Sequence, residues 1–482
     1  MDRISGFGPA DGGSIPPGFI LTYILTTNFL ITDSFHLIMG KTLNQRAKER
    51  AEHLKRLSKN ERAKPGDLVE IHLGKVIYEG ILLESPESEK GTVLLKLGNG
   101  YNLGLNKKDI LEINVLEKFS EKKEEFEIKK HPSKPNIAMI ITGGTISSRY
   151  DPKTGGAHPL DSPESLFKFY PELFEKVNVL KVEIPFMKFS EEMNFRDWQK
   201  IAKTCESLLN DSNIQGVVVT HGTDFLHYTS AALSFMLGKL NKPVVLTYSQ
   251  RSIDRASSDA NLNLICSSFI AGVSDIAEVV LVGHGDSEDK FCHVLPGAKV
   301  RKMHTSRRDA FKAINGKPIA KIFPDGKLEI FGEFNKRNNG KKTKSDTKVE
   351  ESVALVKFYP GQSPDILDYY HGKRYKGVVL ELSGIGNASP EFINKIKELS
   401  SRGMVFCGTS QCINGRVDGL VYSAGRKLID AEVIYLEDML AETALVKLGW
   451  VLGHSEWAKS KEKIKEKMLE NISGEFNRRL EE

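Results

Sequence analysis

From residue 136 onward the chain alternates short apolar runs with longer amphipathic segments, and this alternation restricts the possible fold more than any other feature. The apolar runs are rich in Val and Ile and are bounded by Gly, Thr or Pro, as buried strands are. Strands that alternate with helices form parallel sheets with helices on both faces, and such sheets bind ligands at the carboxyl ends of their strands. The sequence therefore predicts an α/β fold with doubly wound parallel sheets. The predicted strands are 136–141, 216–220, 243–247, 278–282, 377–382 and 404–407, and the predicted helices include 194–210, 228–238, 258–273 and 389–401.

A basic, polar stretch divides this α/β region into two lobes. Residues 335–348 contain six basic residues, one acid and no large apolar residue. We expect a flexible connection at 335–350 between an N-terminal lobe (135–334), which holds the candidate active site, and a C-terminal lobe (351–454). Residues 455–482 are expected to form a charged tail helix.

The region before the α/β lobes has a different character. Residues 65–116 read as about five short strands separated by turns, and Asn99-Gly100 is typical of a tight hairpin turn. Strands of this number and length predict a small SH3-like β-barrel. Residues 117–135 are charge-dense and close with two prolines, which predicts a linker at 117–134.

The first 64 residues hold two further segments. Residues 40–64 contain nine Lys/Arg and three Glu, and this excess predicts a basic helix at 39–64. The helix is expected to be either exposed to solvent or in contact with a partner or RNA. Residues 1–38 include an apolar run, but Asn28, Asp33 and His36 interrupt it. We expect translation to begin at Met39 and 1–38 to be a non-native or disordered extension. A weak membrane anchor and a genuine disordered extension are the alternatives.

Charge and cysteine content exclude some classes of protein. A net charge of +5 on 482 residues does not by itself indicate nucleic-acid binding. The five cysteines are scattered and form no CxxC pair, so neither a disulfide framework nor a zinc site is expected. We expect a cytoplasmic protein without a membrane span and without a metal of its own.

Three polar segments at or beyond predicted strand ends supply the candidate chemistry. The first, 141–148, has two glycines that permit a sharp turn, with Thr145 exposed on it. The second, 219–224, places a hydroxyl and a carboxylate side by side, and the third is the basic segment 300–311. Any one threonine or aspartate here is equally well explained as the cap of a following helix. Together, the three segments predict one site.

These segments resemble a known enzyme family. TGGTIS, THGTD and VRK are similar, in order and spacing, to the three active-site segments of the bacterial-type L-asparaginase/glutaminase family, and the resemblance covers roughly 135–455. It implies a two-lobed asparaginase-like fold. The flanking sequence is closer to one branch, the D subunits of archaeal-type glutamyl-tRNA(Gln) amidotransferases, which also carry a small β-barrel before the asparaginase-like part. The similar stretches are KLGNGYNLG, HGTDFLHYTSAALSFML, VRKMHTSRRDAF, TSQCINGRV and EDMLAETALVKLGWVLGH.

The resemblance implies a glutaminase subunit. A threonine nucleophile would hydrolyse glutamine, or asparagine, and release ammonia. A partner E subunit would use the ammonia to convert Glu-tRNA(Gln) to Gln-tRNA(Gln), and would carry the ATP, the Mg²⁺ and most contacts with tRNA(Gln). The resemblance thus implies no cofactor in this chain, and a homodimer within a heterotetramer.

The resemblance also implies roles for individual residues. Thr145 matches the primary threonine nucleophile, and Thr223, Asp224 and Lys302 match the second catalytic set. A threonine hydroxyl attacks only when another group takes its proton, and a Lys–Asp pair beside Thr223 is able to shuttle one. Backbone N–H groups near Gly144 and Gly222 are expected to bind the substrate oxygen. Ser190 matches the serine that holds the substrate α-carboxylate, with Glu191 next to it.

The sequence departs from the family pattern in three respects. The tyrosine expected after the first turn is replaced by Pro152, so Tyr150 is the candidate helper. Phe225-Leu226 follows THGTD where Thr-Met is common, and the acid that asparaginases take from a neighbouring subunit has no identified equivalent. Two alternative functions stay open, a free-standing L-asparaginase or glutaminase and an inactive scaffold with an RNA- or protein-binding barrel.

Overall fold

The computed structural model describes residues 63–74, 76–83, 91–97, 102–118, 131–150, 157–159, 171–253, 258–338 and 340–479. Residues 1–38, almost all of the expected basic helix at 39–64 and most of the expected linker lie outside these ranges. The described residues belong to two compact units, one that ends at 118 and one that begins at 131.

The first unit is a single antiparallel sheet. Its strand order is β4-β3-β2-β1-β5, with β1 (Leu68–Leu73), β2 (Val76–Leu83), β3 (Thr92–Leu97), β4 (Asn102–Asn106) and β5 (Glu112–Glu117). β3 and β4 pair antiparallel, as the predicted hairpin requires, although the turn itself lies outside the described residues. Val69, Ile71 and Leu95 are fully buried in its core. Because the described pairings leave β4 and β5 as edges, the closed SH3-like barrel stays a prediction.

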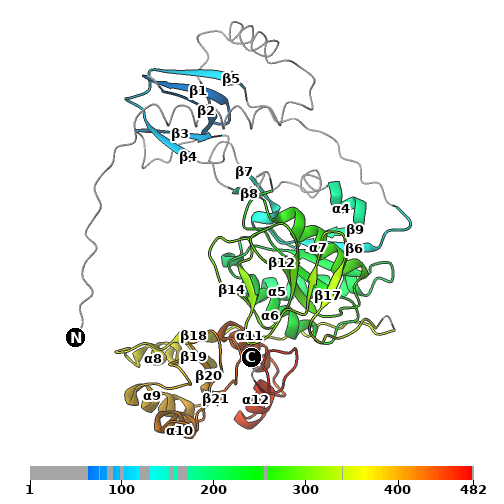
Figure 1. Cartoon of the computed structure of the whole chain (residues 1–482). Coiled ribbons are helices and arrows are strands. Elements are labelled where there is room, and N and C mark those ends of the chain that lie inside the picture. Colours follow the sequence, from blue (N-terminus) through cyan, green and yellow to red (C-terminus); the bar gives the residue numbers. More distant parts are fainter. Residues whose placement is uncertain are drawn as a thin grey trace, which may run out of the picture. The chain divides into compact units, whose positions relative to one another are not determined.

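The larger sheet of the second unit has eight strands and confirms the predicted α/β fold (Figure 1). Its order is β17-β16-β13-β12-β11-β10-β6-β9, and the neighbours from β12 to β9 pair parallel. The parallel strands are β6 (Asn136–Ile141), β9 (Asn178–Glu183), β10 (Gly216–Thr220), β11 (Val244–Thr247) and β12 (Val279–His284). The antiparallel strands are β13 (Cys292–Pro296), β16 (Ala320–Ile322) and β17 (Leu328–Ile330).

Helices cover both faces of this sheet because its strands are apolar on both sides. Alternate residues of β10 divide between two cores. Val217 and Val219 pack in the core that includes α5 (Phe195–Leu209) and α6 (Leu226–Leu237). Val218 packs in the opposite core, which includes α4 (Pro171–Lys176) and α7 (Ala260–Val273).

The C-terminal lobe is built on a parallel sheet of four strands in sequential order. Its strands are β18 (Val353–Lys357), β19 (Gly377–Leu382), β20 (Val405–Ser410) and β21 (Ile434–Tyr435). One face packs against α8 (Asp365–Gly372), α9 (Pro390–Ser401) and α10 (Ser423–Asp430). The other face packs against α11 (Ala441–Leu452), which is buried along most of its length.

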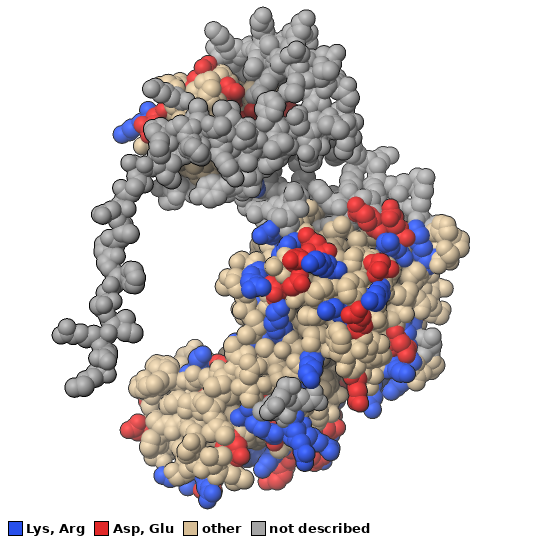
Figure 2. Space-filling view, in the orientation of Figure 1, with Lys and Arg blue, Asp and Glu red and all other residues tan. Residues whose placement is uncertain are grey.

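Charged side chains of both signs are interspersed on the face of the second unit seen in Figure 2. The lower left of that view, over α8, α9 and α10, carries few of them, whereas Lys and Arg gather beside acids near the C-terminal helix α12 (Lys461–Met468). A mixed surface of this kind agrees with the weak net charge and shows no single basic face in this view.

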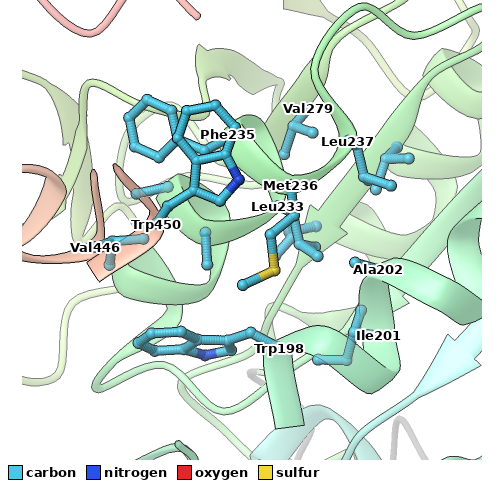
Figure 3. Close-up of a cluster of buried hydrophobic side chains, with 14 of the residues drawn as sticks. Trp198, Ile201, Ala202, Leu233, Phe235, Met236, Leu237, Val279, Val446 and Trp450 are labelled. Atoms are coloured by element: carbon cyan, nitrogen blue, oxygen red, sulfur yellow. The ribbon is translucent and has the colours of Figure 1, made fainter. Parts of the chain in front are cut away.

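The two lobes share a hydrophobic core. Figure 3 shows Trp450 and Val446 of α11 beside Phe235 and Leu233 of α6, and the Phe235 and Trp450 rings stack with centroids 6.0 Å apart. The same cluster contains Val379 of β19. Because side chains of both lobes belong to one buried cluster, this core favours a fixed arrangement of the two lobes.

The segment predicted to be a flexible connection, 335–350, differs from that expectation in its described residues. Thr343 is buried, its hydroxyl donates to Oδ1 of Asn241 at 2.7 Å, and its backbone exchanges two hydrogen bonds with the Asn210 side chain. Ser345 N donates to Glu206 at 3.1 Å. Polar composition misled the prediction, because these polar groups find partners on and after α5. The tail helix is also shorter than expected, with α12 at Lys461–Met468.

Candidate active site

Two glycine turns leave the carboxyl ends of neighbouring strands. β6 and β10 pair in parallel with Ile141 opposite Thr220, so the turns that follow them begin at the same level of the sheet. The Thr142 hydroxyl donates to the Thr220 carbonyl at 2.8 Å, which joins the two turns at their start. The predicted first and second segments are therefore neighbours in space.

The first turn depends on glycine for its shape. Gly143 and Gly144 have φ values of 116° and 81°, in the left-handed region that side chains disfavour. A Cβ on Gly144 would lie 2.4 Å from both N and Cα of Gly222, and one on Gly143 would lie 2.4 Å from the Lys188 carbonyl oxygen. The two turns thus touch backbone to backbone, which leaves no room for side chains at these two positions.

Thr145 begins a short 3-10 helix, η3 (Thr145–Ser147), directly after these glycines. Its neighbours are tied down, since Ser147 Oγ lies 3.2 Å from Thr220 Oγ1 and the Ser148 hydroxyl donates to the Gly144 carbonyl at 2.8 Å. Within the described residues the Thr145 hydroxyl has no hydrogen-bond partner, and the residue is half-buried. Its backbone is fixed while its hydroxyl is unengaged.

The second turn carries a complete polar cluster. Lys302, at the end of β14 (Val300–Lys302), places Nζ 2.8 Å from Thr223 Oγ1 and 2.7 Å from Asp224 Oδ1. Only 9% of the Lys302 side chain is exposed, against 62% of Asp224. The ammonium is therefore held away from water by the protein, while the carboxylate faces solvent and is open to a ligand.

A buried histidine fixes the backbone of the second turn. Nδ1 of His221 lies 2.7 Å from the Gly222 carbonyl oxygen, so it carries the proton and donates. Nε2 then accepts from the Thr229 hydroxyl at 2.8 Å, and Thr229 in turn accepts from the Trp198 indole at 2.9 Å. Complete burial lowers the pKa of His221 to about 4, which keeps the ring neutral and in this tautomer.

Ser190 lies against the second turn. It opens η4 (Ser190–Glu192) and is buried, and its Cβ and Oγ lie 3.1 and 3.2 Å from where a Cβ on Gly222 would be. Its hydroxyl accepts from Phe225 N and donates to Glu191, both at 3.3 Å. These bonds are long, so the hydroxyl is able to turn toward a substrate oxygen at little cost.

The structure thus brings most of the predicted site residues together. Gly144, Gly222 and Ser190 meet by the contacts above, and Thr223, Asp224 and Lys302 meet by hydrogen bonds. Thr145 follows Gly144 directly, and Glu191 is exposed beside Ser190. Tyr150 ends strand β7 (Ser148–Tyr150), which pairs with β8 (Ala157–Pro159), but its side chain lies outside the described residues.

Two further observations concern metal ligands and membrane-spanning helices. Among the described residues, no three His, Cys, Asp or Glu side chains gather as metal ligands would. No helix in the described part of the chain is long and apolar enough to cross a membrane.

Sequence reasoning missed the residues that surround the second turn. His221 and His227 were visible in THGTDFLH, and Glu442 stands alone as an acid in the apolar helix LAETALV. An acid or a histidine inside an apolar segment signals a buried partner. Glu442 pairs with Arg301 at 2.9 Å, directly beside Lys302.

Comparison with protein families gives three matches along the chain. The asparaginase N-terminal domain matches 136–335, the glutaminase/asparaginase C-terminal domain matches 352–468, and the GatD N-terminal domain matches 63–116. The first two matches cover the two α/β lobes, and the third covers the antiparallel sheet.

Individual relatives and structures agree with these matches. The D subunit of the glutamyl-tRNA(Gln) amidotransferase from Pyrococcus furiosus is 50% identical over 83% of this chain and 91% of its own. The corresponding D subunit from Methanothermobacter thermautotrophicus is 43% identical over 86% and 94%. Among solved structures, the thermostable L-asparaginase from Thermococcus kodakarensis is 28% identical, with a TM-score of 0.62 over 71% of this chain and 99% of that one. L-asparaginase I from Vibrio cholerae is 28% identical, with a TM-score of 0.61 over 72% and 100%.

Proposed function

The chain belongs to the asparaginase family, in the branch of the D subunits of glutamyl-tRNA(Gln) amidotransferase, and on this basis we propose that it hydrolyses glutamine with a threonine nucleophile to supply ammonia for tRNA-dependent amidation. The observation that carries the chemistry is the position of Lys302 Nζ, within 2.8 Å of the Thr223 hydroxyl and 2.7 Å of Asp224. A hydroxyl, a buried cation and an open carboxylate beside a glycine turn are suited to amide hydrolysis.

Thr145 is the proposed first nucleophile. Its hydroxyl is unengaged within the described residues, whereas the Thr223 oxygen already accepts a hydrogen bond from Lys302. Attack by Oγ1 of Thr145 on the amide carbon forms an ester and releases ammonia once the leaving nitrogen is protonated. Water then cleaves the ester and gives glutamate and free Thr145, so the enzyme is regenerated.

The cluster of Thr223, Asp224 and Lys302 is the proposed proton carrier. Because Lys302 is the cation of this cluster, the Asp224 carboxylate takes the proton that Thr145 loses and returns it to the leaving nitrogen. In the second step the same carboxylate takes a proton from water and returns it to Thr145. Backbone N–H groups of the two turns are suited to stabilise the oxyanion, a contribution of about 3–4 kcal/mol per donor. Asp224 and Ser190 are suited to hold the substrate α-ammonium and α-carboxylate.

The rest of the reaction is assigned to a partner. We propose that an E subunit carries ATP, Mg²⁺ and most contacts with tRNA(Gln), activates the glutamate of Glu-tRNA(Gln) and receives the ammonia. This chain needs no cofactor for its own step. Because the tRNA substrate is made in the cytoplasm, the complex is proposed to act there.

A homodimer through the α/β lobes is the proposed assembly of this protein. Three consecutive apolar side chains of the C-terminal lobe face outward, with exposed fractions of 64% for Leu420, 54% for Val421 and 58% for Tyr422. Large apolar side chains that are exposed next to each other are typical of protein interfaces. Light scattering at micromolar concentration tests this assembly, and a monomer would contradict it.

A free-standing asparaginase or glutaminase is the second candidate. Its support is the likeness of the two lobes to whole L-asparaginases, which align over 99% of their own length. The match of residues 63–116 to the GatD N-terminal domain favours the amidotransferase subunit. An inactive scaffold is the least favoured reading, because the full polar set is present.

Three assays separate these functions. Ammonia release from glutamine and from asparagine by the isolated chain separates an enzyme from a scaffold. Co-purification with an E-type partner, followed by conversion of Glu-tRNA(Gln) to Gln-tRNA(Gln) with ATP, separates a subunit from a free-standing enzyme. If the chain hydrolyses glutamine but never supports tRNA amidation with such a partner, the second candidate replaces the first.

A further inference from the structure

Strand β14 connects the candidate active site to the C-terminal lobe through two neighbouring residues. Successive strand residues point to opposite faces, so Arg301 and Lys302 point apart. Lys302 reaches Thr223 and Asp224, whereas Nη2 of Arg301 lies 2.9 Å from Oε1 of Glu442. Glu442 is in the first turn of α11. Because Arg301 and Lys302 are covalent neighbours on one strand, a shift of the Arg301 backbone also moves Lys302.

The same carboxylate oxygen also lies near the first turn of α6, which follows Thr223 and Asp224 in the chain. Nε2 of His227 is 3.9 Å from Oε1 of Glu442, and His227 follows Asp224 by three residues at the start of α6. Burial, reinforced by nearby positive charges, lowers the pKa of His227 to about 3, so the ring is neutral. Arg301 is thus the cation that compensates Glu442.

Burial makes the position of Glu442 well defined. Its side chain is 9% exposed and that of Arg301 is 30% exposed. A carboxylate in such surroundings is stable only when it is paired in good geometry, so the pair resists separation. A carboxylate of the C-terminal lobe is therefore paired with the residue directly before Lys302.

Other contacts hold the hairpin that β14 forms with β15 (Phe311–Ala313) but do not reach the site. The Thr443 hydroxyl donates to the Ala298 carbonyl at 3.0 Å, and Lys299 Nζ lies 3.0 Å from Asp438 Oδ2. Both join the lobes just before β14. Among the described residues, the hydrogen bonds and ion pair of the Asp438 side chain go to Lys299 and Asn477 and not to the second turn. Its pair with Lys299 is therefore a matched comparison for the pair of Glu442 with Arg301.

We propose that Glu442 is a positioning residue for amide hydrolysis, which holds Lys302 against Thr223 and Asp224 through its ion pair with Arg301. This inference rests on the proposed function, because it assumes that Lys302 acts in the reaction. The C-terminal lobe then contributes to chemistry as well as to stability. Neither Glu442 nor Arg301 is expected to touch the substrate.

The first test separates turnover from binding. In the full-length protein, Glu442→Ala is expected to lower kcat for glutamine at least about ten-fold, because small displacements of catalytic groups are costly, while KM stays within about three-fold. Glu442→Gln keeps an oxygen that accepts from Arg301 and is expected to recover most of the lost kcat. A normal kcat in Glu442→Ala, or a rise in KM alone, overturns the proposal.

The matched control is Asp438→Ala, which breaks the other buried pair of the same hairpin. It is expected to lower the unfolding temperature but to leave kcat within about three-fold of wild type when assayed well below that temperature. If Asp438→Ala loses as much kcat as Glu442→Ala, the effect is general loosening of the lobes, and the proposal fails.

A second variant keeps the test decisive if Glu442→Ala does not fold. Replacing both Arg301 and Glu442 by Met leaves no unpaired charge, and such replacements of buried pairs are often neutral for stability. This double variant is expected to fold and to lose kcat at least about ten-fold, and normal turnover overturns the proposal. If wild type lacks amide hydrolysis, the proposed function fails as well, whereas normal turnover in the Glu442 variants of an active enzyme removes only this inference.

Discussion

The two threonine turns start from adjacent strands, yet they are completed to different degrees. Thr223 lies in a network that runs from Lys302 to the turn backbone, His221, Thr229 and the Trp198 indole. The hydroxyl of Thr145 has no partner within the described residues, although the backbone around it is tied to the other turn.

This difference indicates a division of labour. A group whose partners are already in place at the correct distances costs no reorganisation when charge develops, which suits proton transfer and electrostatic stabilisation. A nucleophile needs a free lone pair directed at the substrate, which suits Thr145. Predictions that separate the two turns therefore test the proposed mechanism.

The largest effect is expected from removal of groups at either turn. Thr145→Ala, Thr223→Ala, Asp224→Ala and Lys302→Ala are each expected to lower amide hydrolysis at least about 100-fold, because groups that act as a unit fail together. Ammonia release measures this, and circular dichroism must show a folded protein. Near-normal turnover in either the Thr145 or the Lys302 variant would contradict the proposed mechanism.

An intermediate effect is expected from the network behind the second turn. Thr229→Val leaves Nε2 of His221 and the Trp198 indole N–H buried without a partner, at a cost of about 1–3 kcal/mol in unfolding free energy. Turnover should fall as well, because His221, which donates to the Gly222 carbonyl, loses the hydrogen bond that orients its ring. Denaturant unfolding measures the change.

The control for this variant is Thr204→Val. Thr204 also carries a helical hydroxyl, but it is only half-buried, and among the described residues its hydroxyl bonds to the Lys200 carbonyl of the same helix. The Thr204→Val variant should have a free energy of unfolding within about 0.5 kcal/mol of wild type. Equal losses in the two variants would show that the buried network has no special role.

The smallest effect, counted per pH unit, is expected in the pH dependence of the free energy of unfolding. The folded pKa of His221 is about 4, below the ordinary value of 6.5, so the unfolded chain binds a proton more readily between these values. His221 therefore contributes a loss of stability as pH falls from 6.5 toward 4, at up to about 1.4 kcal/mol per pH unit. His221→Gln should reduce this slope, and an unchanged slope would contradict a neutral, buried ring.

Sequence alone was sufficient for the parts of the fold that depend on periodicity and strand order. The predicted strands at 136–141 and 216–220 coincide with β6 and β10. Their parallel pairing then brings Thr145 and Thr223 to one edge of the sheet. Asn194 caps α5 where a helix start was expected, because its side chain accepts from a backbone N–H.

Other parts could not be predicted because they depend on tertiary partners. The polar segment 335–350 looked unstructured, but buried Thr343 and its bonds to Asn210 hold it in place. Nothing in the local sequence pairs Glu442 with Arg301, which is 141 positions earlier in the chain. Long-range pairs of this kind arise only when both lobes have packed.

One measurement tests the division between the two turns most directly. 6-Diazo-5-oxo-L-norleucine is a glutamine analogue whose diazoketone alkylates an attacking hydroxyl, and peptide mapping by mass spectrometry locates the adduct. We predict a single adduct on Thr145, formed more slowly in Lys302→Ala and absent in Thr145→Ala. An adduct on Thr223 in the wild-type protein would contradict the assignment of Thr145 as the nucleophile.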